Sequence, residues 1–179
     1  MKSCITFCAT IIILLHSIGY AQQRPSDSDR SCTEGQRRQF DFWVGSWDLS
    51  WPSGPARPAG FGRNNVQKIF ANCVVQENFS SDAPTQFRGM SLSSYVPELG
   101  KWKQVWADNQ GGYLDFIGES KNGEMVFTRE KEMNGKKILQ RMVWKNIKPM
   151  ELDWSWEKSE DGGQTWQVLW PIHYTRRRQ

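Results

Sequence analysis

Clusters of turn-forming residues recur at short intervals from residue 40 to residue 176, and this spacing constrains the fold more than any other feature of the sequence. Two of the clusters are the pairs Asn122-Gly123 and Asn134-Gly135, which favour the type I′ turn of a β-hairpin because both residues tolerate positive φ. Nine such clusters separate ten short segments. The clusters lie at residues 52–58, 71–72, 80–84, 97–100, 109–112, 122–123, 134–135, 146–149 and 161–163.

The segments between the turns alternate in polarity, as strands do when they bury one face. Trp102 and Trp106 share one face of their segment, and Trp154 and Trp156 share one face of theirs. Only residues 40–45 have a pattern that indicates a helix, as a short apolar turn before the first strand. Consecutive tight hairpins make a meander, and closing the meander removes its exposed edges. We therefore predict an all-β fold, an antiparallel up-and-down barrel of about ten strands with a short N-terminal helical turn. An open sandwich is the alternative.

The first 21 residues have the layout of a cleavable signal peptide. Lys2 precedes an apolar stretch over residues 5–18, and the small residues Gly19 and Ala21 stand three and one positions before the expected cleavage site. The alternative is a membrane anchor, but the stretch is shorter than the roughly 20 residues that a bilayer span requires. We predict a protein exported to the periplasm or outside the cell, without a stable membrane span after cleavage.

The rest of the chain divides into three parts. Residues 22–39 are polar and are expected to form a flexible N-terminal segment, residues 40–176 a single β-barrel domain, and residues 177–179 a basic tail. The formal net charge of the sequence is +4, and its basic run lies at the C-terminal end. A nucleic-acid partner is therefore not expected.

Cleavage would leave two cysteines, Cys32 and Cys73. An exported chain meets an oxidising compartment, so this pair is a candidate disulfide that ties the N-terminal segment to an early strand. The alternative is two separate buried thiols, because the sequence does not say how far apart their Cα atoms lie.

Most catalytic constellations are missing from the mature chain. Its single histidine is His173, and it has no cysteine and histidine cluster of the kind that holds a metal ion, no phosphate-binding glycine loop and no nucleophile elbow. We therefore assign no metal ligand and no catalytic residue. An enzyme that acts on a small or carbohydrate substrate stays open as an alternative, with its acid and base drawn from Glu77, Asp108 and Asp115.

Several segments that look buried carry a polar residue among apolar neighbours, namely Glu77, Gln104, Arg141 and Arg176. Barrels that bind small ligands place a few polar groups inside an apolar cavity, and a buried carboxylate requires a partner such as arginine. Glu77 would then pair with Arg141 or Arg176. The alternative is that these side chains lie on the solvent face, because strand alternation does not say which face is the inner one.

The leading functional prediction is an exported, non-enzymatic barrel that binds a small, partly apolar molecule. The four polar residues would contact that molecule, and the wall of the cavity would be formed by Trp106, Trp144 and Trp154. Besides the enzyme, a structural module that binds a partner through an outer apolar patch stays open.

Residues 159–166 match the Asp-box pattern Ser-x-Asp-x-Gly-x-Thr-Trp, which is known from sialidases and other β-proteins. The Asp side chain of such a box accepts hydrogen bonds from the turn, and the Trp packs beneath the hairpin. A single copy in a chain of this length predicts a stabilised turn rather than a glycosidase.

Five stretches, taken together, resemble the DUF1579 group of exported bacterial proteins of unknown function. They are residues 40–47, 73–77, 102–108, 161–166 and 174–176. The resemblance covers residues 40–176 and implies a calycin-like barrel, as in lipocalins, fatty-acid-binding proteins and nitrobindins, but no established activity.

Nitrobindin-like relatives bind haem through a histidine near the C-terminus, and His173 lies in a comparable region. The resemblance therefore makes haem a minor possibility. Against it, His173 alternates to the face opposite Trp170 and Tyr174, so it points outward if those aromatic residues point inward.

Overall fold

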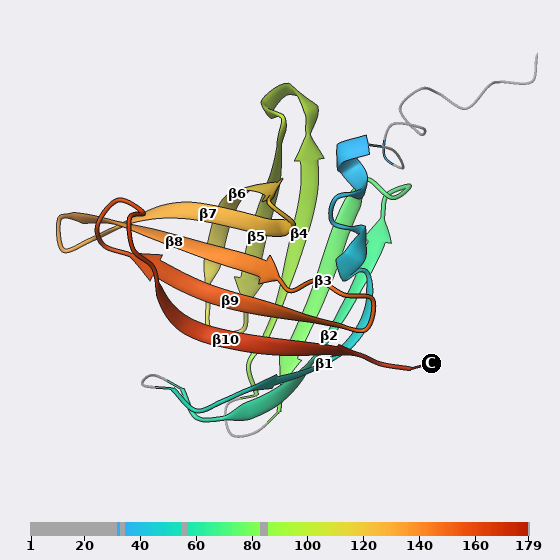
Figure 1. The fold of residues 1–179 in the computed structure, drawn as a ribbon, viewed down its shortest axis with the longest axis horizontal. Coiled ribbons are helices and arrows are strands. Elements are labelled where there is room, and N and C mark those ends of the chain that lie inside the picture. Colours follow the sequence, from blue (N-terminus) through green and yellow to red (C-terminus); the bar gives the residue numbers. More distant parts are fainter. Residues whose placement is uncertain (1–31, 33–34, 55–56, 83–85, 179) are drawn as a thin grey trace, which may run out of the picture.

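The computed structural model of the chain describes residues 32, 35–54, 57–82 and 86–178 (Figure 1). The expected signal peptide and residues 22–31 lie outside the described residues. Within the described part of the chain, no helix has the length and apolar character needed to cross a bilayer.

Ten antiparallel strands form a closed barrel in which each strand pairs with its neighbours along the chain, and β1 and β10 pair to close the ring (Figure 1). The predicted all-β meander barrel is therefore confirmed. The strands are β1 (Gly45–Trp51), β2 (Gly60–Ile69), β3 (Val74–Ser81), β4 (Arg88–Val96), β5 (Lys101–Asp108), β6 (Tyr113–Lys121), β7 (Glu124–Met133), β8 (Lys136–Lys145), β9 (Glu151–Ser159) and β10 (Gln167–Arg176).

Within the described residues, three short 3-10 helices accompany the barrel: η1 (Gly35–Arg38), η2 (Asp41–Trp43) and η3 (Pro97–Leu99). The helix η2 is the helical turn predicted before the first strand. Both Asn-Gly hairpins also form as predicted, since Asn122 and Gly123 have φ values of 54° and 79° and Asn134 and Gly135 have values of 53° and 71°.

The N-terminal segment is attached to the barrel. A disulfide joins Cys32 to Cys73 with the two Cα atoms 4.8 Å apart, as predicted. Trp102 Nε1 donates a hydrogen bond to Gln39 Oε1 over 3.2 Å. These two bonds connect the described residues before Phe40, which include the η1 helix, to the barrel.

The helix η2 lies at the end of the barrel at which β10 finishes (Figure 1). Aromatic side chains fill the interior at this end. Phe40 is fully buried, and its ring centroid lies 4.8 Å from that of Trp43, 5.6 Å from Trp102, 5.5 Å from Phe127 and 5.1 Å from Trp144. Rings in such edge-on and offset contacts occupy the interior closely. A cavity inside the barrel therefore has to lie toward the opposite end.

The turn between β9 and β10 has the hydrogen bonds expected of an Asp-box. Asp161 accepts bonds from the hydroxyl group (2.6 Å) and the backbone N–H (2.9 Å) of Thr165 and from Ser159 Oγ (2.7 Å), and these bonds hold the pKa of its carboxyl group well below the usual range. Trp166 Nε1 donates to the Gly163 carbonyl over 3.1 Å. The motif stabilises the turn, as the sequence indicates.

Candidate functional site

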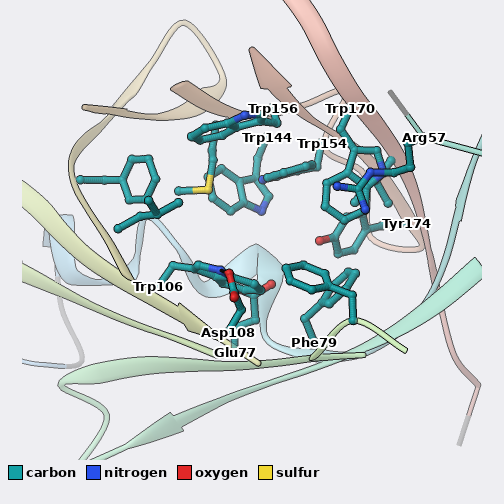
Figure 2. A pocket seen from close by; sticks show the side chains of 15 residues that line it. Arg57, Glu77, Phe79, Trp106, Asp108, Trp144, Trp154, Trp156, Trp170 and Tyr174 are labelled. Carbon is teal, nitrogen blue, oxygen red and sulfur yellow. Dashed lines mark hydrogen bonds between the residues drawn. The ribbon is translucent and has the colours of Figure 1, made fainter. Parts of the chain in front are cut away.

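A cavity of about 220 Å³ lies inside the barrel, between the aromatic cluster around Phe40 and the end formed by the β1–β2, β3–β4 and β5–β6 connections. Fifteen residues line it, and nine of them are aromatic. Figure 2 shows Trp144, Trp154 and Trp156 on one side, facing Trp106, Phe79 and Glu77 on the other. The first group comes from β8 and β9, and the second from β3 and β5.

Edge-on contacts fix the aromatic walls. Trp154 meets Trp144 at 6.2 Å and 76° and meets Trp170 at 5.8 Å and 90°. Phe79 extends this series of contacts, with its ring centroid 5.8 Å from that of Trp170 and 6.1 Å from that of Trp106. Such contacts hold each ring in place, so the cavity has preformed flat walls. Trp106, Trp144 and Trp154, which the sequence predicts as wall residues, all lie in this lining.

Glu77 is the buried carboxyl group of the cavity, as the sequence predicts. It lies at the centre of β3, where Asn64 Nδ2 from β2 donates to Oε1 (2.6 Å) and Ser91 Oγ from β4 donates to Oε2 (2.7 Å). Asn64 Nδ2 is also 3.3 Å from the hydroxyl group of Tyr174. Burial disfavours the charged carboxylate more than the two hydrogen bonds favour it, so the pKa of Glu77 rises to about 7.

Asp108 is the second acid of the lining and lies where β5 ends. Its Oδ2 accepts a hydrogen bond from Trp106 Nε1 (2.9 Å), and its Oδ1 accepts bonds from the backbone N–H groups of Gln110 and Gly112 (2.9 Å each). Burial would raise the pKa of Asp108, but these three bonds outweigh it and hold the pKa below its usual value. Asp108 is therefore ionised at neutral pH.

Gln104 lies on the inner face of β5, as its place between Trp102 and Trp106 predicts, but it is not part of the cavity lining. Its side chain is buried and donates from Nε2 to Ser93 Oγ on β4 over 2.8 Å. The prediction that it contacts a ligand is not supported by this position.

Arg141 does not lie in the cavity, and its predicted pairing with Glu77 is wrong. It projects from the outer face of β8 and forms an ion pair with Glu157 of β9, with Nη2 at 2.6 Å from Oε2. Its guanidinium carbon lies 3.9 Å from the ring centroid of Trp166. The reason is strand alternation, which directs the neighbouring Met142 and Trp144 inward and Arg141 outward.

Arg176 is not a partner of Glu77 either. It lies at the filled end of the barrel, where Nη1 donates to the Val44 carbonyl (2.7 Å), Nη2 to the Phe42 carbonyl (2.9 Å) and Nε to the Pro149 carbonyl (2.7 Å). Its guanidinium carbon is 4.1 Å from the ring centroid of Trp47. Arg176 therefore holds the chain around η2 against β1 and β10, and its role is structural.

Arg57 is the cationic residue of the lining, and the sequence does not predict it as a site residue. It follows β1 in a connection fixed by the backbone pairing of Gly54 with Arg57 and by a hydrogen bond from Trp51 Nε1 to the Pro58 carbonyl (3.2 Å). Its guanidinium carbon lies 3.7 Å from the ring centroid of Trp170. A connection between strands has no alternation to reveal which side chains face inward, so no pattern marks this residue.

His173 lies on the outer face of β10, with Nδ1 2.8 Å from Asp153 Oδ1, and does not line the cavity. It could not ligate a group held inside the barrel. The described residues contain no group of three or more His, Cys, Asp and Glu side chains that could hold a metal ion.

Comparison of the chain with protein-family models gives no match, and comparison with curated proteins gives none either. The resemblance to the DUF1579 group therefore stays a prediction.

Proposed function

We propose that this protein is a binding protein for a small, partly apolar molecule, which it holds inside the barrel. The observation that carries the proposal is the preformed aromatic cavity of about 220 Å³ with a buried carboxyl group, Glu77, in its wall. An apolar cavity of roughly 150 Å³ suffices for a benzene molecule, so a ligand with one or two rings is the expected size. A module that binds a partner through an outer apolar patch does not require such a cavity.

A cavity-filling substitution tests the proposal. Leu114 lines the cavity from β6, and Ile117 on the same strand is exposed. Leu114→Trp should fill the space that the ligand needs, whereas Ile117→Trp adds the same ring outside the barrel. Native mass spectrometry of protein purified from its own source should show a bound small molecule in the wild type and in Ile117→Trp but not in Leu114→Trp. A bare chain in all three, with no effect of naphthalene on tryptophan fluorescence, would contradict the proposal.

One observation favours a second candidate function, an enzyme. Glu77 combines a pKa of about 7 with a place in a cavity wall, and a general acid or base works best when its pKa is near the ambient pH. In that case Glu77→Gln should abolish turnover of a small ester or glycoside substrate while leaving the affinity for its product analogue unchanged. Absence of turnover across a panel of chromogenic esters and glycosides would favour the binding protein.

The protein is further proposed to be exported. The Cys32–Cys73 disulfide supports this, because disulfides persist in oxidising compartments and are rare in the cytosol. The intact mass of the protein from its own source should equal that of a chain starting at Gln22 with both thiols oxidised. A full-length mass in the cytosolic fraction would contradict export.

A further inference from the structure

The cavity is rich in hydrogen-bond donors that have no acceptor. Trp144 and Trp170 both line it, and the Nε1 atoms of both are buried without a hydrogen-bond partner among the described residues. An indole N–H is only a donor, so neither atom can be satisfied by another donor. Buried polar groups without a partner are uncommon in native proteins, and these two belong to residues that line the cavity.

Arg57 adds charge to this set of donors. In the part of the chain that the structure describes, its guanidinium group forms no ion pair with a carboxylate and donates no hydrogen bond. Its guanidinium group packs over the ring of Trp170. Arg57 and Trp170 therefore present a positive charge and an N–H group side by side at one edge of the cavity (Figure 2).

The acidic side chains of the cavity already have donors. Both oxygen atoms of Glu77 accept hydrogen bonds from side chains of the neighbouring strands, and Asp108 accepts three from its own turn and from Trp106. Burial also raises the pKa of Glu77 to about 7, so Glu77 is mainly neutral below that pH and offsets little of the charge of Arg57 there. Among the described residues, neither Glu77 nor Asp108 forms an ion pair with Arg57, so Arg57 has no anionic partner in the cavity.

We propose that the ligand is a small aromatic carboxylate, with its ring between the tryptophan walls and its carboxylate on Arg57 and the indole N–H of Trp170. This inference rests on the proposed binding function and adds the chemical class of the ligand. A planar guanidinium group matches the two oxygen atoms of a carboxylate, and charged hydrogen bonds of this kind are the strong ones. A cationic ligand would leave both indole N–H groups and Arg57 without an acceptor.

Three probes that share one ring system separate charge from shape: naphthalene-2-carboxylate, neutral naphthalene-2-carboxamide and a trimethylammonium derivative of naphthalene. Binding to the purified protein is measured by calorimetry and by tryptophan fluorescence. The carboxylate should bind at least about tenfold more tightly than the carboxamide, and the ammonium derivative should bind most weakly. Arg57→Gln should remove most of the preference for the carboxylate, and Arg57→Lys should keep part of it.

Arg63→Gln is the matched control, because Arg63 is an exposed residue of β2 that does not line the cavity. It should leave all three affinities unchanged. Trp170→Phe keeps an aromatic wall without the indole N–H and should weaken the carboxylate more than naphthalene itself. If the carboxamide or the ammonium derivative binds as tightly as the carboxylate, the assignment of the ligand class is overturned while the binding function stands. If no probe and no naphthalene binds, both are overturned.

Discussion

Burial disfavours the charged form of Glu77 more than the hydrogen bonds from Asn64 and Ser91 favour it, which places its pKa near 7 against an ordinary value of 4.5. Between these two pH values the unfolded chain has lost the proton that the folded protein keeps. The folded state then binds more protons, so the free energy of unfolding falls as the pH rises through this window, by roughly 3 kcal/mol in total. Below pH 4.5 the group contributes no slope.

Glu77→Gln should remove this slope, because an amide of the same shape does not titrate. We expect its free energy of unfolding, measured by urea denaturation across the window, to stay level where that of the wild type falls. Glu132→Gln removes an exposed carboxylate from β7 and should retain the wild-type slope. Parallel curves for the wild type and Glu77→Gln would show that Glu77 ionises normally in the folded protein.

Arg176 holds three backbone carbonyl groups and covers the ring of Trp47. The backbone passes so close to Arg176 that position 45 has no room for a side chain, since a Cβ atom on Gly45 would lie 2.2 Å from Nη1 of Arg176. Arg176→Ala should lower the free energy of unfolding by about 3 kcal/mol, because several charge-assisted hydrogen bonds are lost together. Arg177→Ala is the control, with an expected change within about 0.5 kcal/mol for an exposed side chain. Equal effects of the two substitutions in urea denaturation would contradict the structural role of Arg176.

At the scale of single elements, the disulfide attaches the N-terminal segment to the turn that precedes β3. Its two cysteines are 41 residues apart, and a cross-link of that length restricts the unfolded chain enough to stabilise the fold by about 2–4 kcal/mol. The double substitution Cys32→Ser with Cys73→Ser should lower the free energy of unfolding by this amount. The wild type in reducing agent should show the same loss, and naphthalene-2-carboxylate affinity should stay unchanged because the cavity lies toward the other end. An unchanged stability would mean that the segment contributes little to the fold.

The order of the elements could be predicted from sequence because the turn residues and the strand alternation are local signals. Asn122-Gly123 and Asn134-Gly135 adopt the positive φ values that the pairs favour, and Trp102, Gln104 and Trp106 share the inner face of β5. In β10 a register shift between Val168 and Trp170 interrupts the alternation, so Val168 is exposed although strict alternation would place it on the same face as Trp170.

The candidate site was harder to predict because it depends on contacts between strands and on a connection. In β8 both faces are buried around residue 143, since Val143 on the outer face is as inaccessible as Trp144 on the inner one. The pattern of hydrophobic residues therefore does not indicate that Arg141 faces outward. Glu77 was found because a lone acid in an apolar strand is visible in the sequence. Its partners Asn64 and Ser91 were not, because only the register of β2, β3 and β4 brings them together.

Over the whole molecule, the two ends of the barrel differ in how their interiors are packed. The end at η2 is filled by Phe40 and the rings that surround it, and the opposite half holds the cavity, where Phe87 is one of the lining residues. Phe87 is only partly buried and contacts Trp106 and Trp170 at centroid distances of 6.0 Å and 6.4 Å. Stability should therefore depend on the filled end and binding on the hollow one.

The same substitution at each end tests this division. Phe40→Ala removes a fully buried ring and should lower the free energy of unfolding by about 3–5 kcal/mol, whereas Phe87→Ala enlarges an existing cavity and should cost less than about 2 kcal/mol. For the affinity of naphthalene-2-carboxylate the order should reverse, with Phe87→Ala weakening it and Phe40→Ala leaving it nearly intact at a temperature where that variant is folded. Both quantities come from urea denaturation and fluorescence titration of the same samples. If Phe40→Ala and Phe87→Ala each lowered stability and affinity in proportion, the barrel would respond as one unit. A cavity that is independent of the filled end requires the two effects to separate.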